Sequence, residues 1–98
     1  FSCVLAAGEY TMTVFGVTGP TAGKNDWALN GAAAFSTGND WYSAGAGYNT
    51  SKTASMVVGS SGRQLITITQ NGKNASASDY VFALTYIEIK LATFTAQV

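Results

Sequence analysis

The feature that most constrains the fold of this chain is an alternation of apolar and polar residues with a period of two. In the segment 10–14, Tyr10, Met12 and Val14 alternate with two threonines. Because successive side chains of a β-strand point to opposite faces, this pattern predicts a strand with one buried face. The segments 65–69 and 86–91 alternate in the same way, and their predicted inward residues are Ile66, Ile68, Ile87, Ile89 and Leu91.

Shorter apolar stretches complete the set of predicted strands. Residues 56–58 form one such stretch, and residues 93–98 alternate again. The segment 81–84 is apolar at every position, which indicates a strand buried on both faces or covered by a neighbouring subunit. Helical periodicity is hard to find, and its longest candidate is the short segment 32–35.

Turns rich in glycine and asparagine separate these segments. Gly19-Pro20, Gly38-Asn39, residues 59–62 and Asn71-Gly72 all predict turns. Asn71-Gly72 predicts a two-residue hairpin turn, because type I′ turns require positive φ at both central positions. Short strands with turns between them predict an all-β fold. We expect a single antiparallel β-sandwich or jelly roll of about 7–9 short strands spanning residues 1–98.

The low charge of the chain limits its partners. Charged residues make up 10% of the 98 residues, and five basic residues balance five acidic ones. No Lys/Arg cluster exists to neutralise phosphates, so we expect no nucleic-acid partner. A surface with net charge near zero favours association, so we expect the chain to bind copies of itself. Because no apolar run reaches about 20 residues, we expect no membrane-spanning segment.

The residue types that most often carry catalysis are scarce. The chain has no histidine and a single cysteine, Cys3, which removes the commonest general base and any internal disulfide. The serine-rich run 51–61 lacks the Gly-x-Ser-x-Gly pattern of a nucleophile elbow. No loop has the alternating carboxylates of a calcium site. We therefore expect no catalytic residues, no cofactor and no metal site.

The tripeptide Asn-Asp-Trp occurs twice, at 25–27 and 39–41. We interpret each copy as a turn made by Asn and Asp, after which Trp opens a strand. An indole beside a carboxylate also suits a sugar, which stacks on the ring and hydrogen-bonds through its hydroxyls at a concave site. The predicted ligand-binding residues are therefore Asp26, Trp27, Asp40 and Trp41. The alternative, favoured by the usual environments of these residue types, is that both Asp residues cap turns and both Trp residues fill the core.

Two asparagines begin N-glycosylation sequons. These are Asn49 and Asn74, and both fall in predicted loops. In a chain so rich in asparagine and serine, chance occurrence is the simpler interpretation.

The segment 81–89 predicts an assembly surface. Phe82, Leu84 and Tyr86 share one face of the predicted strand, and the other face carries Ile87 and Ile89. Because a two-layer sandwich has one interior, a strand that is apolar on both faces needs a second cover. A neighbouring copy is the simplest cover. We therefore predict a homo-oligomer, with a trimer favoured, whose interface contains Phe82, Leu84 and Tyr86 and whose axis lies near Phe82 and Tyr86.

Two stretches of the chain resemble a known kind of domain. Residues 1–10 end in Leu-Ala-Ala-Gly-Glu-Tyr, and residues 80–91 end in Tyr-Ile-Glu-Ile-Lys-Leu. They resemble the opening and closing strands of the C-terminal jelly-roll (tumour-necrosis-factor-like) domains of bacteriophage tail-fibre and receptor-binding proteins. The resemblance implies a trimeric sandwich at a fibre tip, in a virion or outside the cell, that contacts a host-surface polysaccharide. No binding residue carries over from it.

Three functions remain open. The first is a non-enzymatic virion module, such as a tail-fibre tip or receptor-binding domain, that forms a homo-oligomer and contacts a host-surface glycan. The second is a self-assembling structural subunit, such as a capsid-decorating protein or an extracellular filament subunit. The third is a non-viral lectin-like sugar-binding domain, which glycan binding dependent on Trp27 or Trp41 would favour.

Overall fold

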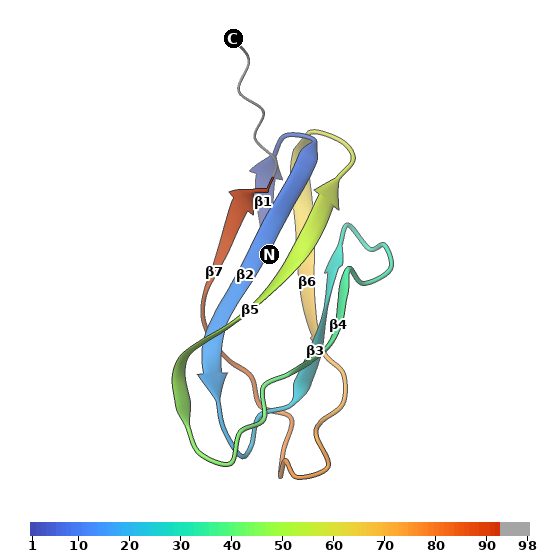
Figure 1. Ribbon diagram of the computed structural model, residues 1–98. Coiled ribbons are helices and arrows are strands. Elements are labelled where there is room, and N and C mark those ends of the chain that lie inside the picture. Colours follow the sequence, from blue (N-terminus) through green and yellow to red (C-terminus); the bar gives the residue numbers. More distant parts are fainter. Residues whose placement is uncertain (93–98) are drawn as a thin grey trace.

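The computed structural model describes residues 1–92, which form seven β-strands and no helix. One sheet contains, in spatial order, β1 (Ser2–Leu5), β6 (Gly62–Gln70), β3 (Lys24–Leu29) and β4 (Ser36–Asp40). The other contains β5 (Gly47–Val58), β2 (Gly8–Thr18) and β7 (Ala83–Leu91) (Figure 1). Every strand pairing is antiparallel. The predicted antiparallel β-sandwich is confirmed, with seven strands.

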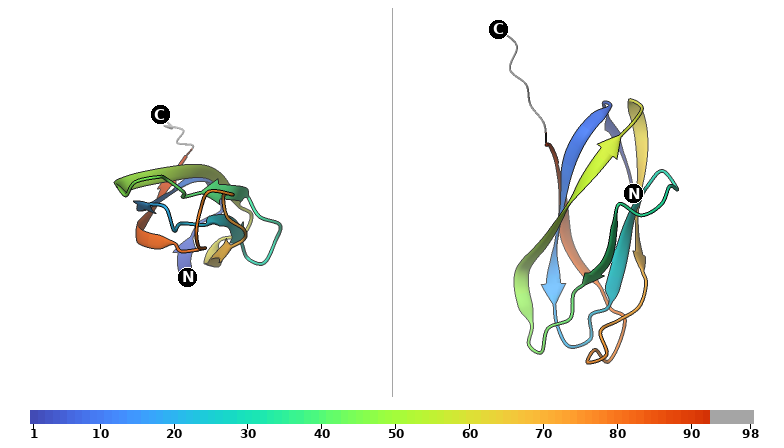
Figure 2. Two further views of the ribbon diagram at one scale, coloured as in Figure 1. Left: turned by 90° about the horizontal axis from the view of Figure 1, so that it is seen from below. Right: turned by 45° about the vertical axis from the view of Figure 1, so that its right-hand side comes forward.

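The two sheets pack face to face (Figure 2). Their inward side chains form one core. The central strand β2 contributes Tyr10, Met12 and Val14, as its alternation predicts. The other large buried side chains are Trp27, Trp41, Met56, Val58 and Ile66. Two indoles and two thioethers therefore fill much of the interior, which suits a small domain because large side chains bury much apolar area per residue.

The predicted inward residues of β6 and β7 also pack on this core. Ile66 is fully buried, and Ile68, Ile87 and Ile89 are partly buried against the core cluster. The inward face predicted from alternation is therefore confirmed for β6 and for the part of β7 that contains Ile87 and Ile89. The predicted strand at 93–98 lies outside the described residues.

Two strands have no alternation in the sequence to predict them. Strand β5 is 12 residues long, whereas the sequence indicates only residues 56–58. Its register against β2 directs Thr50, Lys52 and Ala54 inward, and these residues give no apolar signal. Strand β4 is short and polar. Strand β4 and the first part of β5 exist because a neighbouring strand pairs with them rather than because their own inward residues are apolar.

The predicted hairpin at Asn71-Gly72 is wrong. Gly72 does adopt a positive φ of 97°, but β1 and β3 already occupy the two sides of β6. The chain instead leaves β6 through a loop, residues 71–82, and enters β7 in the other sheet. The start of this loop pairs with β3, since the Asn71 amide donates to the Lys24 carbonyl and the Lys24 amide donates to the Gly72 carbonyl.

A β-bulge interrupts the alternation of β7. Tyr86 pairs with Phe15 and Leu84 pairs with Gly16, so Thr85 has no partner on β2. An extra residue of this kind shifts the side-chain alternation by one position. Strict alternation would place Leu84 and Tyr86 on the same face of β7. The bulge at Thr85 places them on opposite faces.

The predicted common face of Phe82, Leu84 and Tyr86 is therefore wrong. Phe82 and Leu84 line the space between the sheets together with Ile87. Tyr86 lies on the outer face, where its ring stacks on Phe15 with centroids 4.2 Å apart. The bulge thus gives β7 one apolar inner face, and the argument that a strand apolar on both faces needs a second cover no longer applies.

Candidate functional site

An open groove lies between β7 and β6. It encloses about 490 Å³, and its lining is mainly apolar. The apolar lining residues are Phe1, Ile66, Ile68, Phe82, Leu84 and Ile87.

The groove is open because β1 covers only the first half of β6. Its residues 2–5 pair with residues 62–65, and the ladder ends where the Phe1 backbone exchanges two hydrogen bonds of 2.8 Å with Ile66. Beyond Ile66, no strand of the described residues pairs with this side of β6. Across the groove, β7 pairs with β2 alone among the strands of residues 1–92. Two free strand edges therefore border one apolar surface.

The inner face of β7 is only partly covered. Leu84 and Leu91 point inward but are 49% and 52% exposed. At the other edge of the same sheet, Met56 and Val58 on β5 are buried, and the Lys52 ammonium lies 5.4 Å from the centre of the Trp41 ring. The sandwich is thus closed on its β5 side and incompletely closed on its β7 side.

The backbone of β7 is oriented to accept another strand. The Ala92 amide donates to the Glu9 carbonyl over 2.9 Å. In an antiparallel ladder, alternate residues direct both backbone groups to the same neighbour. The backbone amides and carbonyls of residues 86, 88, 90 and 92 therefore point toward β2. Those of Ile87, Ile89 and Leu91 point toward the open edge.

The predicted sugar-stacking residues Trp27 and Trp41 lie in the core. Both side chains are fully buried, and both indole N–H groups donate to the same atom, Asn25 Oδ1, over 2.9 and 3.2 Å. The Trp41 ring also packs against Phe82, with centroids 5.0 Å apart. Neither ring has a free face for a sugar, so the core-filling interpretation is confirmed and the stacking interpretation is wrong.

The two Asn-Asp-Trp segments lie side by side, because Asn25 on β3 pairs with Asn39 on β4. The first segment is inside β3, and Trp41 follows the end of β4. The prediction that Trp opens a strand after each turn is therefore wrong. Sequence analysis missed Asn25 as the polar centre of the core, although the repeated tripeptide was a signal that the two segments interact.

The Asp26 carboxylate joins two other segments of the chain. Its carboxylate accepts hydrogen bonds from Asn71 Nδ2 at 2.7 Å and from the Gly38 amide at 2.8 Å. These two bonds stabilise the charged form and lower the pKa of Asp26 below its usual value. The carboxylate therefore links the end of β6 to β4.

Asp40 has the same role one loop away. It accepts from the Tyr42 amide at 3.0 Å, as predicted for a turn, and from Asn74 Nδ2 at 2.9 Å. Partial burial acts to raise its pKa, but the two hydrogen bonds and the positive charges of Lys24 and Lys52 outweigh this effect, so the pKa is lowered.

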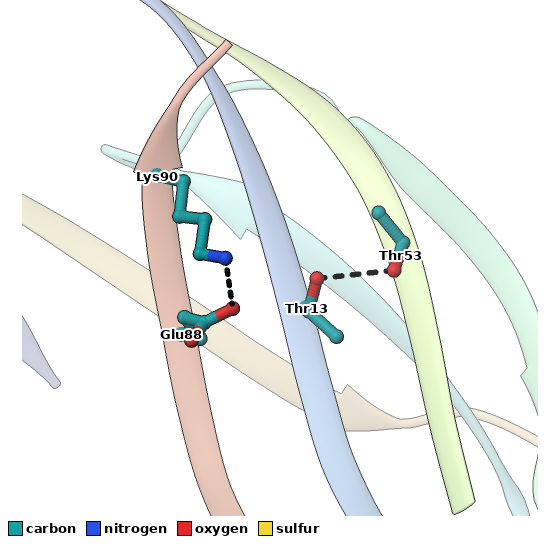
Figure 3. Close-up of polar contacts among 4 residues, drawn as sticks. All are labelled: Thr13, Thr53, Glu88 and Lys90. Atoms are coloured by element: carbon teal, nitrogen blue, oxygen red, sulfur yellow. Dashed lines mark hydrogen bonds and ion pairs between the residues drawn. The ribbon is translucent and has the colours of Figure 1, made fainter.

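The outer face of the three-stranded sheet is polar at its centre. The hydroxyls of Thr13 on β2 and Thr53 on β5 lie 3.0 Å apart, and Glu88 pairs with Lys90 along β7 at 3.4 Å (Figure 3). In residues 1–92, no three His, Cys, Asp or Glu side chains gather where they could hold a metal ion. This part of the chain contains no helix that is long and apolar enough to cross a membrane.

Comparisons of the chain with protein-family models, with curated proteins and with solved structures find no match in any of the three. The resemblance to tail-fibre domains therefore stays a prediction. The candidate site is an apolar groove beside a free strand edge.

Proposed function

We propose that this domain is a non-enzymatic assembly module that joins protein chains through the open side of its sandwich at β7. The observation that supports this function is the juxtaposition of an apolar groove with a free strand edge. An added strand satisfies the edge hydrogen bonds and removes the groove from water at the same time.

The polar groups of the domain support a structural function as well. The Asp26 and Asp40 carboxylates hydrogen-bond to the loop 71–82, and Asn25 accepts hydrogen bonds from the two indoles. The groove itself is lined by apolar side chains together with Thr67 and Gln70. Such a lining suits a protein segment, because its binding energy comes from apolar burial rather than from charge.

An assembly module of this kind fits a virion or extracellular setting, at a tail-fibre tip or in a capsid or filament lattice. The tail-fibre resemblance and the low charge of the chain favour that setting. We propose a homo-oligomer as the assembled form. Leu84 is its main interface residue among the three predicted from the sequence, because it is half exposed and lines the groove.

The test is the oligomeric state of the purified domain, measured by light scattering at tens of micromolar. We expect the parent chain to associate and Leu84→Asp to shift it to monomer, because a carboxylate buried in an apolar contact is costly. The matched control is Val57→Asp. Val57 is 66% exposed and lies on the outer side of β5, so this variant should assemble like the parent. A monomeric parent chain would contradict the proposal.

A second candidate function, glycan binding, is favoured by one observation on the outer face. The Tyr86 ring is 52% exposed and is held by its stack on Phe15. A fixed, exposed aromatic ring is a suitable platform for a pyranose. On a glycan array, this function predicts binding that Tyr86→Ala removes and Trp27→Phe retains.

A further inference from the structure

Strand β7 has few of the features that usually protect a strand edge. It is nine residues long, contains no proline and carries only two charges, Glu88 and Lys90. Natural edges are commonly blocked by proline, by inward charges or by short length. The only irregularity in β7 is the bulge at Thr85, which leaves residues 86–92 as a regular edge.

We propose that the occupant of this edge is β7 of a second copy, paired antiparallel about a two-fold axis at Ile89. This inference rests on the proposed assembly function and specifies its partner and register. In this register Ile89 faces Ile89 of the second copy, and Ile87 faces Leu91 of the second copy. The two three-stranded sheets become one continuous six-stranded sheet. The assembled form is then a dimer, in place of the trimer favoured from the sequence.

The backbone fits this register. The amides and carbonyls of Ile87, Ile89 and Leu91 are those that face the open edge, as the Ala92–Glu9 hydrogen bond indicates. When two copies pair about Ile89, the amides of these three residues in one copy lie opposite carbonyls of the same three residues in the other copy. The bulge at Thr85 ends the regular edge and limits the ladder to the segment 86–92.

The charges of β7 select the same register. Glu88 and Lys90 lie on the outer face (Figure 3), and pairing about Ile89 sets each Glu88 opposite Lys90 of the second copy. These positions are non-hydrogen-bonded pairs of the new ladder, in which cross-strand side chains lie closest. A two-fold axis at residue 88 would oppose Glu88 to itself, and an axis at residue 90 would oppose Lys90 to itself. Like charges directly opposite each other disfavour both alternatives.

The apolar face fits as well. Ile87 and Ile89 are partly exposed and point inward, and Leu91 is half exposed. In the two-fold pair, Leu91 of the second copy lies beside Ile87, which lines the groove. The same register therefore matches hydrogen bonds on the edge, charges on one face and apolar side chains on the other.

The decisive experiment uses two charge-reversal variants, Glu88→Lys and Lys90→Glu, and mixes them. In the first variant the introduced lysine would face Lys90 of the second copy, and in the second variant the introduced glutamate would face Glu88 of the second copy. We expect each variant alone to raise the dimer dissociation constant about tenfold or more, because like charges are opposed across the interface. An equimolar mixture should recover dimers to within about threefold of the parent, since every cross-strand pair is again of opposite charge.

The mixture distinguishes charge pairs between two copies from charge pairs within one β7 strand. Each variant keeps two like charges on its own β7, so repair inside a chain cannot restore association. The control is Arg63→Glu, which changes net charge as Lys90→Glu does but lies on β6 and should leave the dimer unchanged. Two outcomes would overturn the proposal: a mixture that stays monomeric, and single variants that still associate like the parent.

Disulfide trapping tests the register directly. In a Cys3→Ser background, a mixture of Glu88→Cys and Lys90→Cys chains should give a covalent dimer, because these two positions are opposed. Each variant alone should give little covalent dimer, because the cysteines of two identical chains are not opposite each other in this register. If Leu84→Asp dissociates the parent but neither the charge mixture nor the cysteine mixture forms a dimer, the assembly function stands and this register is wrong.

Discussion

At the scale of single residues, Asn25 organises the interior. Its side chain is fully buried, accepts from both indoles through Oδ1, and donates from Nδ2 to Gln70 at 3.0 Å. Gln70 in turn donates to the Tyr80 carbonyl at 2.6 Å. Among the described residues, no buried side-chain nitrogen or oxygen lacks a partner. A fully satisfied network of this kind fixes the position of both Trp rings.

Asn25→Ala should therefore be strongly destabilising. It removes the shared acceptor and leaves two buried indole N–H groups without a partner, which costs roughly 2–6 kcal/mol in the free energy of unfolding at about 1–3 kcal/mol per group. Urea denaturation followed by Trp fluorescence measures this change. Ser55→Ala, on the exposed part of β5, is the control and should unfold near the parent midpoint. An Asn25→Ala variant as stable as the parent would mean that the network contributes nothing.

At the scale of elements, the bulge in β7 and the glycine opposite it belong together. Gly16 faces the interior where β7 crosses the core, and a Cβ there would lie 2.8 Å from the Ala83 carbonyl oxygen and 3.2 Å from the Trp41 ring. The backbone of β7 and the indole thus occupy the space that a side chain would need. The bulge moves Phe82 and Leu84 to the inner face, and Gly16 makes room for them.

Gly16→Ala should destabilise the domain by overpacking. Its methyl group meets a backbone carbonyl that cannot move freely, so we expect a loss of about 1–3 kcal/mol. Gly45→Ala is the matched control, because no atom lies within 4 Å of its added Cβ. Thermal unfolding monitored by circular dichroism compares the two. Equal melting temperatures for the two variants would show that the strands can separate without cost.

At the scale of the whole molecule, the loop 71–82 is fastened to the four-stranded sheet by two carboxylates. Asp26 binds Asn71 and Asp40 binds Asn74. Both links need the ionised acid, because each carboxylate oxygen accepts from an amide. The pKa values of both groups are lowered in the folded protein, so their contribution to stability is present above the unfolded pKa of about 4 and is lost as the pH falls through the folded values.

Stability should therefore fall on the acid side. We expect the urea midpoint to decrease as the pH falls below about 4, and to decrease less in the double variant Asp26→Asn/Asp40→Asn, which is also less stable at pH 7. Asp79→Asn changes a loop carboxylate outside both links and serves as the control. If the double variant retained the full pH dependence of the parent, other groups would account for the acid sensitivity.

The sequence by itself determined the fold class and the inward faces of β2, of β6 and of β7 beyond Thr85, because apolar alternation is a local property of a strand. For Trp27 and Trp41 it left two interpretations open, a sugar site and the core, and favoured the core. The tertiary structure alone decided which strands pair, where Thr85 interrupts the alternation, and that Asn25 serves both indoles. These features depend on contacts between segments distant in the chain, and no local pattern encodes them. The open edge of β7 is such a feature, since no other strand in the described part of the chain arrives to pair with it.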